Sequence, residues 1–278
     1  MKQLSVIILT YNSEKDIYQC LESVYQYNDI GEDLEVIVVD NQSKDFATMQ
    51  QEIAKRYPQV IITQNTHNGG YGQGNNVGIR IATAPVVAIM NPDIRLMQPI
   101  FAAALQTLDN KDVIMCAGKQ MHSPTQLGWS YAFDYNALSF LQVPLRNIYK
   151  RFDYYDYRHM HLSGAFFFIK KACFEQIGMF DEQIFMYGEE CDIHLRLRKA
   201  FPKKQIQFLP IPICIYRQSD PLRRNATANC STPICMYVAS MDCPRRTICA
   251  FDYLPCAYAY CAANCKEEAA SKRRPTHQ

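Results

Sequence analysis

The sequence lacks any long run of apolar residues and any strong excess of one charge. Its apolar stretches, such as residues 6–9 and 164–169, are far shorter than the roughly 20 residues that a membrane-spanning helix needs. The formal net charge is only +2, without the basic excess typical of a protein that binds nucleic acid. Residues 1–3 lead directly into a short strand pattern and do not resemble a signal peptide. We therefore expect a cytoplasmic globular protein that binds no nucleic acid.

Glycine and branched aliphatic residues are scarce towards the C-terminus. All 11 glycines lie at or before Gly188. From residue 218 to residue 278 the valine, isoleucine and leucine residues are Leu222, Ile234, Val238, Ile248 and Leu254. Such a segment can bury little apolar surface, which favours an irregular tail. We interpret residues 218–278 as an atypical cysteine-rich tail, and we hypothesise that a frameshift near codon 215 replaced the original C-terminus.

The 12 cysteines lack the paired CxxC spacing of a zinc finger. Seven lie in the tail, at Cys230, Cys235, Cys243, Cys249, Cys256, Cys261 and Cys265. The others, Cys20, Cys116, Cys173, Cys191 and Cys214, lie in apolar segments and are interpreted as small buried hydrophobic residues. A disulfide framework would be unusual in a cytoplasmic protein.

Apolar strands alternate with helical patterns through the first half of the chain. We expect strands at residues 4–9, 35–39, 60–63 and 86–90, and helices at residues 13–27, 45–57 and 74–83. Ser13 and Asp16 would form a capping box at the first helix. Apolar strands that alternate with helices indicate a parallel sheet covered on both faces. The fold class is therefore α/β, with a nucleotide-binding type of domain over about residues 1–118.

Polar residues follow three of these strands. They are Thr10-Tyr11-Asn12, Asp40-Asn41-Gln42-Ser43 and Asn91-Pro92-Asp93. Ligands bind outside the carboxyl ends of the strands in such sheets, so these groups are candidates for binding a divalent cation, a base or a sugar. Each set also fits a turn or a helix cap. Their convergence on one edge favours the binding interpretation.

The densest glycine cluster, NTHNGGYGQGNNVGI, occupies residues 65–79. Glycine lets main-chain N–H groups approach a phosphate or a sugar closely. The cluster has neither the ending of a Walker loop nor the spacing of a dinucleotide fingerprint. A sugar-binding wall and a flexible loop are both consistent with it.

Three carboxylates fall in the first turn of a helix expected from residue 189, which follows a strand expected at residues 162–169. They are Glu189, Glu190 and Asp192. The helix dipole favours acidic residues there, and Asp192 can pair with Arg196, so a capped surface helix is one interpretation. The other is catalytic, because neighbouring carboxylates raise one another's pKa and suit one of them to accept a proton.

Six motifs in order resemble those of inverting family-2 glycosyltransferases, most closely the bacterial rhamnosyltransferase-like branch. They are SVIILTYN, VIVVDNQS, NGGYGQGNNVGI, AIMNPDI, LSGAFFFIKK and GMFDEQIFMYGEECDIHLR. The resemblance covers about residues 3–200. It implies a GT-A fold, a Rossmann-like mixed sheet flanked by helices, over residues 1–217. Residues 1–118 would bind the nucleotide sugar, and residues 119–217 would form the acceptor and catalytic half.

The resemblance also implies roles for individual residues. Asp40 would bind the base, and Asp93 would bind Mg²⁺ or Mn²⁺ on the donor diphosphate. Glu190 matches the catalytic base, supported by Glu189 and Asp192. The remaining nucleotide-sugar contacts would be Thr10, Tyr11, Asn12, Asn41, Asn68, Gly70, Asn75 and Asn91, the last standing where relatives have a second carboxylate.

The implied reaction moves a sugar, such as rhamnose or another deoxyhexose, from a nucleoside-diphosphate sugar. The acceptor would be a bacterial surface polysaccharide or a lipid-linked saccharide, with peripheral association at the inner face of the membrane. Many relatives carry a metal-site histidine near a strand like residues 211–216, whereas Tyr216-Arg217-Gln218 follows here. An inactive relative that only binds nucleotide sugar is therefore the alternative.

Two further features have less specific interpretations. The aromatic and basic residues at 121–160 would form either an acceptor platform or an aromatic core patch with a solvated basic face. His161 and His194 are expected to be ordinary surface or hydrogen-bonded histidines.

Overall fold

The computed structural model describes residues 1–123, 125–128, 130–134 and 152–215. They belong to the first of the two units into which the chain divides, Met1–Gln218. The expectations for the tail and for the aromatic residues at 135–151 fall outside the described residues. Within those residues, no helix is both long and apolar enough to cross a membrane.

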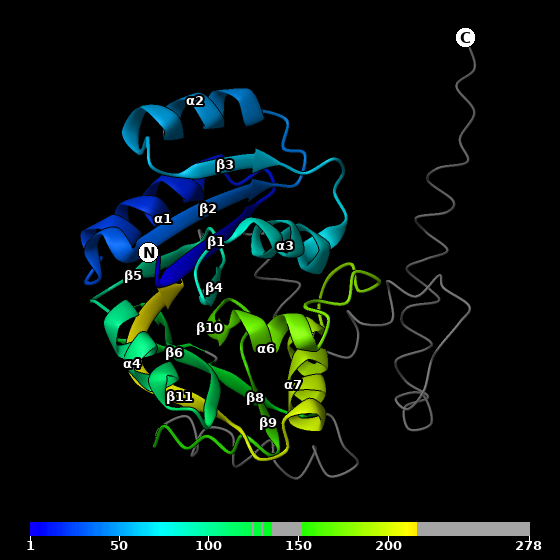
Figure 1. Ribbon diagram of the computed structural model, residues 1–278. Coiled ribbons are helices and arrows are strands. Elements are labelled where there is room, and N and C mark those ends of the chain that lie inside the picture. Colours follow the sequence, from blue (N-terminus) through cyan, green and yellow to red (C-terminus); the bar gives the residue numbers. More distant parts are fainter. Residues whose placement is uncertain (124, 129, 135–151, 216–278) are drawn as a thin grey trace, which may run out of the picture. The chain divides into compact units, whose positions relative to one another are not determined.

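Four parallel strands form one half of the main sheet (Figure 1). They are β1 (Leu4–Thr10), β2 (Leu34–Asp40), β3 (Ile61–Gln64) and β4 (Val86–Met90), in the order β3-β2-β1-β4. β1 pairs with β2 and β4, and β2 pairs with β3, all in parallel. The α/β expectation for the first part of the chain is thus confirmed.

The other half makes the sheet mixed. β10 (Phe166–Lys170) runs antiparallel to β4 and to β6 (Val113–Ser123). β11 (Gln205–Ile215) runs parallel to β6 and antiparallel to β5 (Ile94–Leu96). β7 (Gln126–Leu127) pairs with β6, and β8 (Tyr131–Phe133) pairs with β9 (Met160–Leu162) in a separate hairpin-like ribbon.

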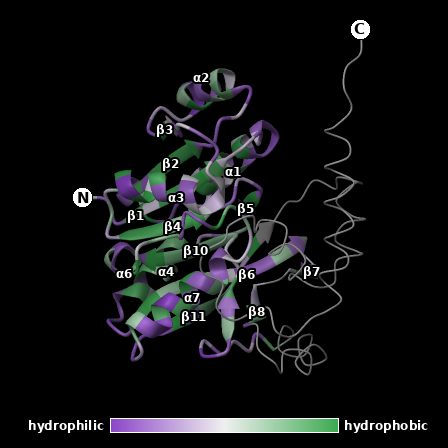
Figure 2. Cartoon of the chain, turned by 90° about the vertical axis from the view of Figure 1, so that its right-hand side faces the viewer, coloured by the Kyte–Doolittle hydropathy of each residue, from purple (hydrophilic) through white to green (hydrophobic). Residues whose placement is uncertain are grey.

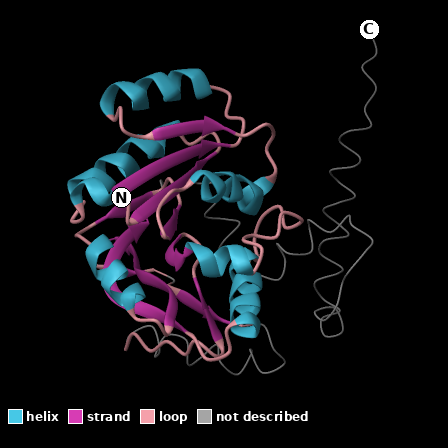
Figure 3. Cartoon of the chain, in the orientation of Figure 1, coloured by secondary structure: helices cyan, strands magenta, loops and turns pink. Residues whose placement is uncertain are grey.

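Helices cover both faces of the sheet (Figure 3). One core joins α1 (Glu14–Gln26), α2 (Phe46–Arg56) and α4 (Phe101–Asp109) to inward residues of β1 such as Val6. The other joins α3 (Gly70–Ile81), α6 (Lys171–Gln176) and α7 (Glu189–Ala200) to alternate residues such as Ile7. A short 3₁₀ turn, Gly31–Asp33, precedes β2.

The two cores explain why the strands are apolar throughout. Adjacent side chains of a strand point to opposite faces, so Val6 and Ile7 enter different cores and are both fully buried. Apolar residues accordingly gather in the strands between the helices (Figure 2). Each fully buried side chain of this size contributes about 1.5–3 kcal/mol relative to exposure.

The helix in the glycine cluster begins earlier than expected, at Gly70 rather than near Gly74. Its glycines let it lie very close to the sheet. A Cβ added at Gly78 would come within 2.5 Å of Ile7 Cγ2, and one at Gly74 would come within 2.5 Å of Leu9 Cδ1. The cluster is therefore the first part of a closely packed helix and not only a loop.

Two local expectations are wrong. Ser13 precedes α1, but its hydroxyl makes no cap hydrogen bond and instead donates to the Tyr11 carbonyl. The strand expected at residues 162–169 is divided between β9 and β10. The strand breaks because backbone groups of residues 163–165 form hydrogen bonds with α3, with α7 and with the loop after β4, as described below.

The cysteine interpretation holds for part of the set. Cys20 and Cys116 are buried, as expected of small hydrophobic residues. Cys173 and Cys191 are only partly buried, and Cys191 has polar neighbours that sequence reasoning did not find.

Candidate active site

The carboxyl ends of β1, β2 and β4 bring the expected polar residues to one edge of the sheet. Thr10 lies opposite Asp40 in the parallel register, and Asn91 directly follows β4. Asn12 adopts a left-handed φ of 49°. Its N–H donates to Ser43 Oγ at 2.8 Å, and its side-chain oxygen accepts from Lys44 N–H at 3.2 Å. The loops after β1 and β2 are therefore fastened together, while Tyr11 beside them is exposed.

Asp40 is fully buried at the floor of this edge. Its carboxylate accepts hydrogen bonds from Thr10 Oγ1 at 3.1 Å, from Ser43 N–H at 2.9 Å and from Gln64 Nε2 at 3.2 Å. Its oxygens thus orient protein groups. Contact with a base stays a prediction.

Asn41 connects the end of β2 to the start of α3. It is 2% exposed, and its Nδ2 donates to the Gly70 carbonyl at 2.9 Å and to Asn68 Oδ1 at 3.3 Å. Asn68 Oδ1 also accepts from the Gly70 N–H at 3.1 Å. These three residues, all expected among the nucleotide-sugar contacts, therefore form one hydrogen-bonded network.

Asn75 lies one turn further along α3 and is fully buried. Its Nδ2 donates to the Tyr71 carbonyl at 2.9 Å. Its Oδ1 is buried and has no hydrogen-bond partner among the described residues. Because a buried acceptor without a partner is costly, this oxygen suits a ligand group that donates a hydrogen bond.

The turn at 163–165 joins α3 to the acidic helix α7. The Gly164 carbonyl accepts a hydrogen bond from the Tyr71 hydroxyl at 2.8 Å, and the Gly164 N–H donates to Glu190 Oε1 at 3.3 Å. The next carbonyl, of Ala165, accepts from the Asn91 N–H at 2.8 Å. One turn thus positions residues of α3, of α7 and of the loop after β4.

The Tyr71 hydroxyl is affected by the charge of three carboxylates. Burial raises the pKa of Tyr71 well above its usual value, and the negative charges of Glu190, Glu189 and Asp93 raise it further. Carboxylate oxygens are hard donors of the kind that Mg²⁺ and Mn²⁺ prefer. One of the three, Glu189, is 4% exposed, and its Oε1 has no hydrogen-bond partner among the described residues. Burial, with a contribution from Glu190, raises the pKa of Glu189 to about 7.

The His194 side chain forms a hydrogen bond with the backbone of Glu190. Its Nδ1 lies 2.7 Å from the Glu190 carbonyl oxygen, and its Nε2 accepts a hydrogen bond from the Leu162 N–H at 3.0 Å. Burial lowers the pKa of His194 to about 3, so the ring is neutral and carries its proton on Nδ1. The expectation of a hydrogen-bonded histidine is confirmed, but its link to Glu190 was missed.

The Asp192 side chain interacts with a residue one turn further along α7. Its carboxylate forms an ion pair with Arg196, the pairing that the spacing allowed. Arg196 also donates to the carbonyls of Ile177 at 2.6 Å and Met179 at 2.7 Å. Asp192 therefore anchors the loop before α7, and its part in catalysis stays a prediction.

The loop before α7 carries three exposed apolar side chains, Phe185, Met186 and Tyr187. Its backbone is fixed to α3, because the Phe185 carbonyl accepts from Tyr71 N–H at 2.8 Å. Gly70 makes this approach possible, since a Cβ there would lie 2.1 Å from Phe185 O. Tyr187, at φ 71°, and Gly188, at φ 103°, are both left-handed just before Glu189. Nothing in the local sequence pattern signalled this strained entry.

β11 ends beside the loop that carries Asp93. Ile215 pairs with Ile94, and Cys214 pairs with Arg95. The metal-site histidine implied by the resemblance would lie near this end of β11. Residues 216–218 fall outside the described part of the chain.

Comparison with known proteins agrees with this arrangement. The family model described as glycosyl transferase family 2 matches residues 5–178. The low-salt glycan biosynthesis hexosyltransferase Agl10 of Haloferax volcanii is 28% identical over 211 residues, which cover 72% of this chain and 62% of that protein. The rhamnosyltransferase WbbL of Escherichia coli K12 is 25% identical over 210 residues, which cover 70% and 76% of the two chains.

A solved structure has the same fold. The mannosyltransferase PcManGT from Pyrobaculum calidifontis, in complex with GDP-Man and Mn²⁺, aligns with a TM-score of 0.60 at 14% identity, over 99% of this chain and 76% of that chain. The expected GT-A fold, a mixed sheet flanked by helices, is thus confirmed. The chain matches less than two thirds of Agl10.

Proposed function

The chain belongs to glycosyl transferase family 2, and we propose that it transfers a hexosyl group with inversion from a nucleoside-diphosphate sugar to a saccharide acceptor. The observation that carries this proposal is the turn at 163–165. Through Gly164 it connects Tyr71, on the donor side, to the Glu190 carboxylate. A donor pocket and a carboxylate base must lie side by side for a single in-line displacement.

The donor would lie along the edge formed by the loops after β1, β2 and β4. Thr10, Tyr11 and Asn12 would line the nucleotide pocket, with Asp40 below the base. Asn68, Gly70 and Asn75 would form the wall beside the sugar, supported by the buried network around Asn41. The orphan Oδ1 of Asn75 supports a contact with a sugar hydroxyl.

The carboxylates whose charges act on Tyr71 fit a divalent cation. Asp93 would hold Mg²⁺ or Mn²⁺, and the PcManGT complex contains Mn²⁺ with GDP-Man. When bound, the ion neutralises the charge that develops on the leaving diphosphate.

Glu190 would accept the proton of the attacking hydroxyl. Its Oε1 rests on the Gly164 N–H, and its backbone carbonyl is held by His194. Both contacts fix the carboxylate relative to the donor wall. Glu189 and Asp192 would act around it, the first as a buried neighbour and the second through the loop that Arg196 binds.

The finer proposal concerns substrate and place. The likeness to WbbL, named a rhamnosyltransferase, supports a deoxyhexose such as rhamnose as donor sugar. The acceptor would be a bacterial surface polysaccharide or a lipid-linked saccharide. The protein would then work on the cytoplasmic side, in peripheral contact with the membrane, and without nucleic acid.

A second candidate is a relative that binds nucleotide sugar without turnover. It is favoured by the end of β11, where Ile215 lies opposite Ile94 and the sequence continues without the histidine of the relatives. Translation of the other reading frames of the gene from codon 215 tests the frameshift behind it. A continuation with a histidine and a helical pattern supports the frameshift, and its absence from both frames refutes it.

The function is tested by screening the purified full chain against dTDP-, UDP- and GDP-sugars with Mn²⁺. Thermal stabilisation identifies the donor, because a ligand that binds the folded state raises the melting temperature. Multiple turnovers with a saccharide acceptor support transfer. Binding without transfer supports the second candidate, and the absence of any nucleotide-sugar binding contradicts both.

A further inference from the structure

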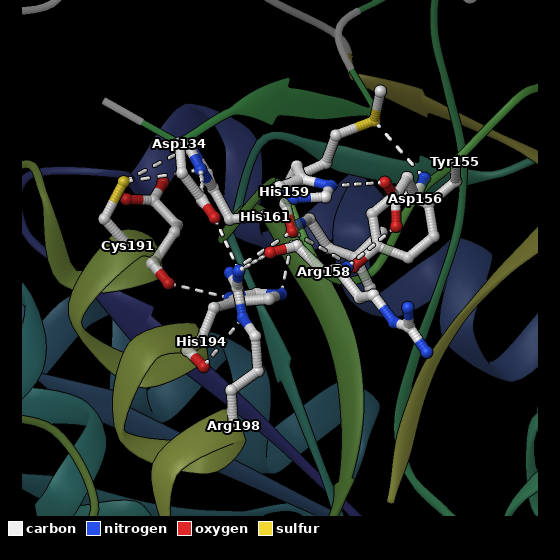
Figure 4. Close-up of polar contacts among 12 residues, drawn as sticks. Asp134, Tyr155, Asp156, Arg158, His159, His161, Cys191, His194 and Arg198 are labelled. Atoms are coloured by element: carbon white, nitrogen blue, oxygen red, sulfur yellow. Dashed lines mark hydrogen bonds and ion pairs between the residues drawn. The ribbon is translucent and has the colours of Figure 1, made fainter. Parts of the chain in front are cut away.

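A cluster of three metal-ligating side chains lies where the β8–β9 ribbon meets the first turn of α7 (Figure 4). Asp134 directly follows β8, His161 lies in β9 and Cys191 lies in the first turn of α7. One carboxylate oxygen, one ring nitrogen and one thiol sulfur come within 4.8 Å of one another. The reaction proposed above uses none of them.

The distances are close to those of a metal site. His161 Nδ1 lies 3.0 Å from Asp134 Oδ1, and Cys191 Sγ lies 3.3 Å from His161 Nδ1. Zinc binds such atoms at about 2.0–2.3 Å in a tetrahedron, which places the ligands roughly 3.3–3.8 Å apart. The third pair, Asp134 and Cys191, also has its ligand atoms within 4.8 Å of each other.

The surroundings favour a cation at the thiol. Among the described residues whose charge reaches Cys191, three carboxylates, Asp134, Glu190 and Asp192, outnumber the single guanidinium of Arg198. The site is also sheltered, since the side chains of His161 and Asp134 are only 11% and 17% exposed. A cation that enters it would be poorly screened by water.

Arg198 would orient the Asp134 carboxylate in such a site. It bonds to Asp134 Oδ2, whereas the atom that faces His161 is Asp134 Oδ1. A ligating carboxylate is commonly oriented by a hydrogen bond to its second oxygen. Arg198 also donates to the Arg158 carbonyl at 2.6 Å, so it fixes Asp134 against the β8–β9 ribbon.

His194 is close to the cluster but is not a ligand. Its ring centroid lies 6.1 Å from that of His161. Both of its nitrogens are engaged, one with the Glu190 carbonyl and one with the Leu162 N–H. His161 is therefore the imidazole that the site would use.

We propose that Asp134, His161 and Cys191 bind a borderline divalent transition metal, Zn²⁺ in the first place, at a site separate from the donor cation. The ligand set separates the two ions. Nitrogen and sulfur ligands select zinc, whereas the carboxylate oxygens expected at the donor site suit Mg²⁺ or Mn²⁺. The zinc site would tie the β8–β9 ribbon to the first turn of α7, one residue from Glu190.

The test must distinguish Cys191 from the seven tail cysteines, so it is read at the level of peptides. The full chain, freed of metal with a chelator, is alkylated slowly in the presence and absence of Zn²⁺, and the labelling of each cysteine is followed by mass spectrometry. We expect Zn²⁺ to slow the labelling of Cys191 by about tenfold or more. Cys173, partly buried at α6, is the internal control and should keep its rate.

Variants then assign the ligands. His161→Gln should remove the protection of Cys191, while Cys173→Ser should leave it intact. Cys191→Ser should bind one zinc equivalent fewer than the parent chain by metal analysis, whether or not it transfers sugar. Unchanged labelling of Cys191 with Zn²⁺, equal protection in the His161→Gln chain, or equal zinc content in the Cys191→Ser chain would overturn the proposal.

Discussion

His194 Nδ1 donates a hydrogen bond to the backbone carbonyl of Glu190, 2.7 Å away and one turn earlier in α7. The other ring nitrogen accepts from Leu162 N–H. A neutral, fully buried imidazole thus bridges β9 and the first turn of the acidic helix. The position of the proposed base depends on this bridge.

We predict that His194→Leu lowers kcat while the affinity for the donor stays nearly unchanged. The substitution removes the side-chain hydrogen bond to the Glu190 carbonyl and leaves the buried Leu162 N–H without its partner, which costs about 1–3 kcal/mol. Steady-state kinetics and donor titration calorimetry separate the two effects. His194→Gln, which keeps a donor and an acceptor, should recover part of kcat.

Leu197→Ala is the matched control for stability, because Leu197 is buried in the same helix, about two turns after Glu190. It should cost about 2–5 kcal/mol of unfolding free energy and leave kcat of the folded fraction near the parent value. An equal loss of kcat in both variants would mean that His194 acts only through stability.

Glu190→Gln is predicted to remove most turnover and to leave donor binding intact. The amide is close to the carboxylate in size but cannot accept the proton of the acceptor hydroxyl, and such general-base catalysis is worth roughly 10²- to 10⁴-fold. A transfer assay and donor calorimetry measure the two quantities. Glu22→Gln, on an exposed part of α1, controls for the loss of one carboxylate, and near-normal turnover of Glu190→Gln would disprove the base assignment.

Gly70→Ala should lower the stability of the fold more than Gly178→Ala does. The two glycines have nearly equal left-handed φ angles, 89° and 87°, so the backbone cost of about 1–3 kcal/mol is shared. They differ in space, because a Cβ at Gly70 would lie 2.1 Å from Phe185 O, whereas one at Gly178 meets nothing within 4 Å.

Thermal unfolding of both variants, with and without donor, measures this difference. The Gly70→Ala chain should also lose donor affinity, since the loop before α7 can no longer bond to Tyr71 N–H. Equal melting temperatures for the two variants would show that the contact between Gly70 and Phe185 contributes nothing.

Some elements of the fold follow from the local sequence, and others depend on contacts between distant residues. The parallel strands β1, β2 and β4 were predictable, because runs such as Leu4–Thr10 are apolar on both faces and end in polar residues. The break between β9 and β10 was not, since Gly164 donates to Glu190 across 26 positions of sequence. The same holds for β11, whose pairing with β5 joins distant segments.

For the site, the ordered motifs predict roles for Glu190 and Asp93, and these roles stay predictions. The motifs also contain Tyr71 and Gly164, but they do not indicate that these two residues bond to each other. Tyr71 looks like any aromatic residue in a glycine cluster, and Cys191 looks like a small hydrophobic residue on a helix. Their neighbours, Gly164 and His161, become visible only when the turn and the ribbon have folded against α7.

Glu35 provides a pH dependence that lies away from the proposed reaction. Burial alone would raise its pKa, but hydrogen bonds from Ser5 and Thr83 outweigh that effect and lower the pKa of the folded state. A carboxyl with a depressed folded pKa stabilises the fold above its unfolded pKa of about 4.3, and the stabilisation is lost as the pH falls through the folded value.

We therefore predict that Glu35→Gln lowers the melting temperature at pH 7 and that the difference from the parent chain shrinks in acid. Thermal unfolding between pH 7 and pH 3 measures it. The exposed Glu32 near the start of β2 is the control, and Glu32→Gln should show little difference at any pH. A constant difference across the range would show that the charge of Glu35 is not what stabilises the fold.

Asp93→Asn is predicted to abolish the Mn²⁺-dependent part of donor binding. The loop that carries Asp93 is held at the edge of the sheet by the bond between Asn91 N–H and the Ala165 carbonyl, so the amide should keep its place while losing its charge. At a donor concentration of 100 times Kd the parent chain gains about 2.7 kcal/mol of stability, and the variant should gain little beyond its metal-free value. Asp109→Asn, at the exposed end of α4, should behave as the parent.

Zinc protection of Cys191 should survive in the Asp93→Asn chain, because the two metal sites share no ligand. Loss of this protection together with the Mn²⁺ response would mean that the two ions compete for one site.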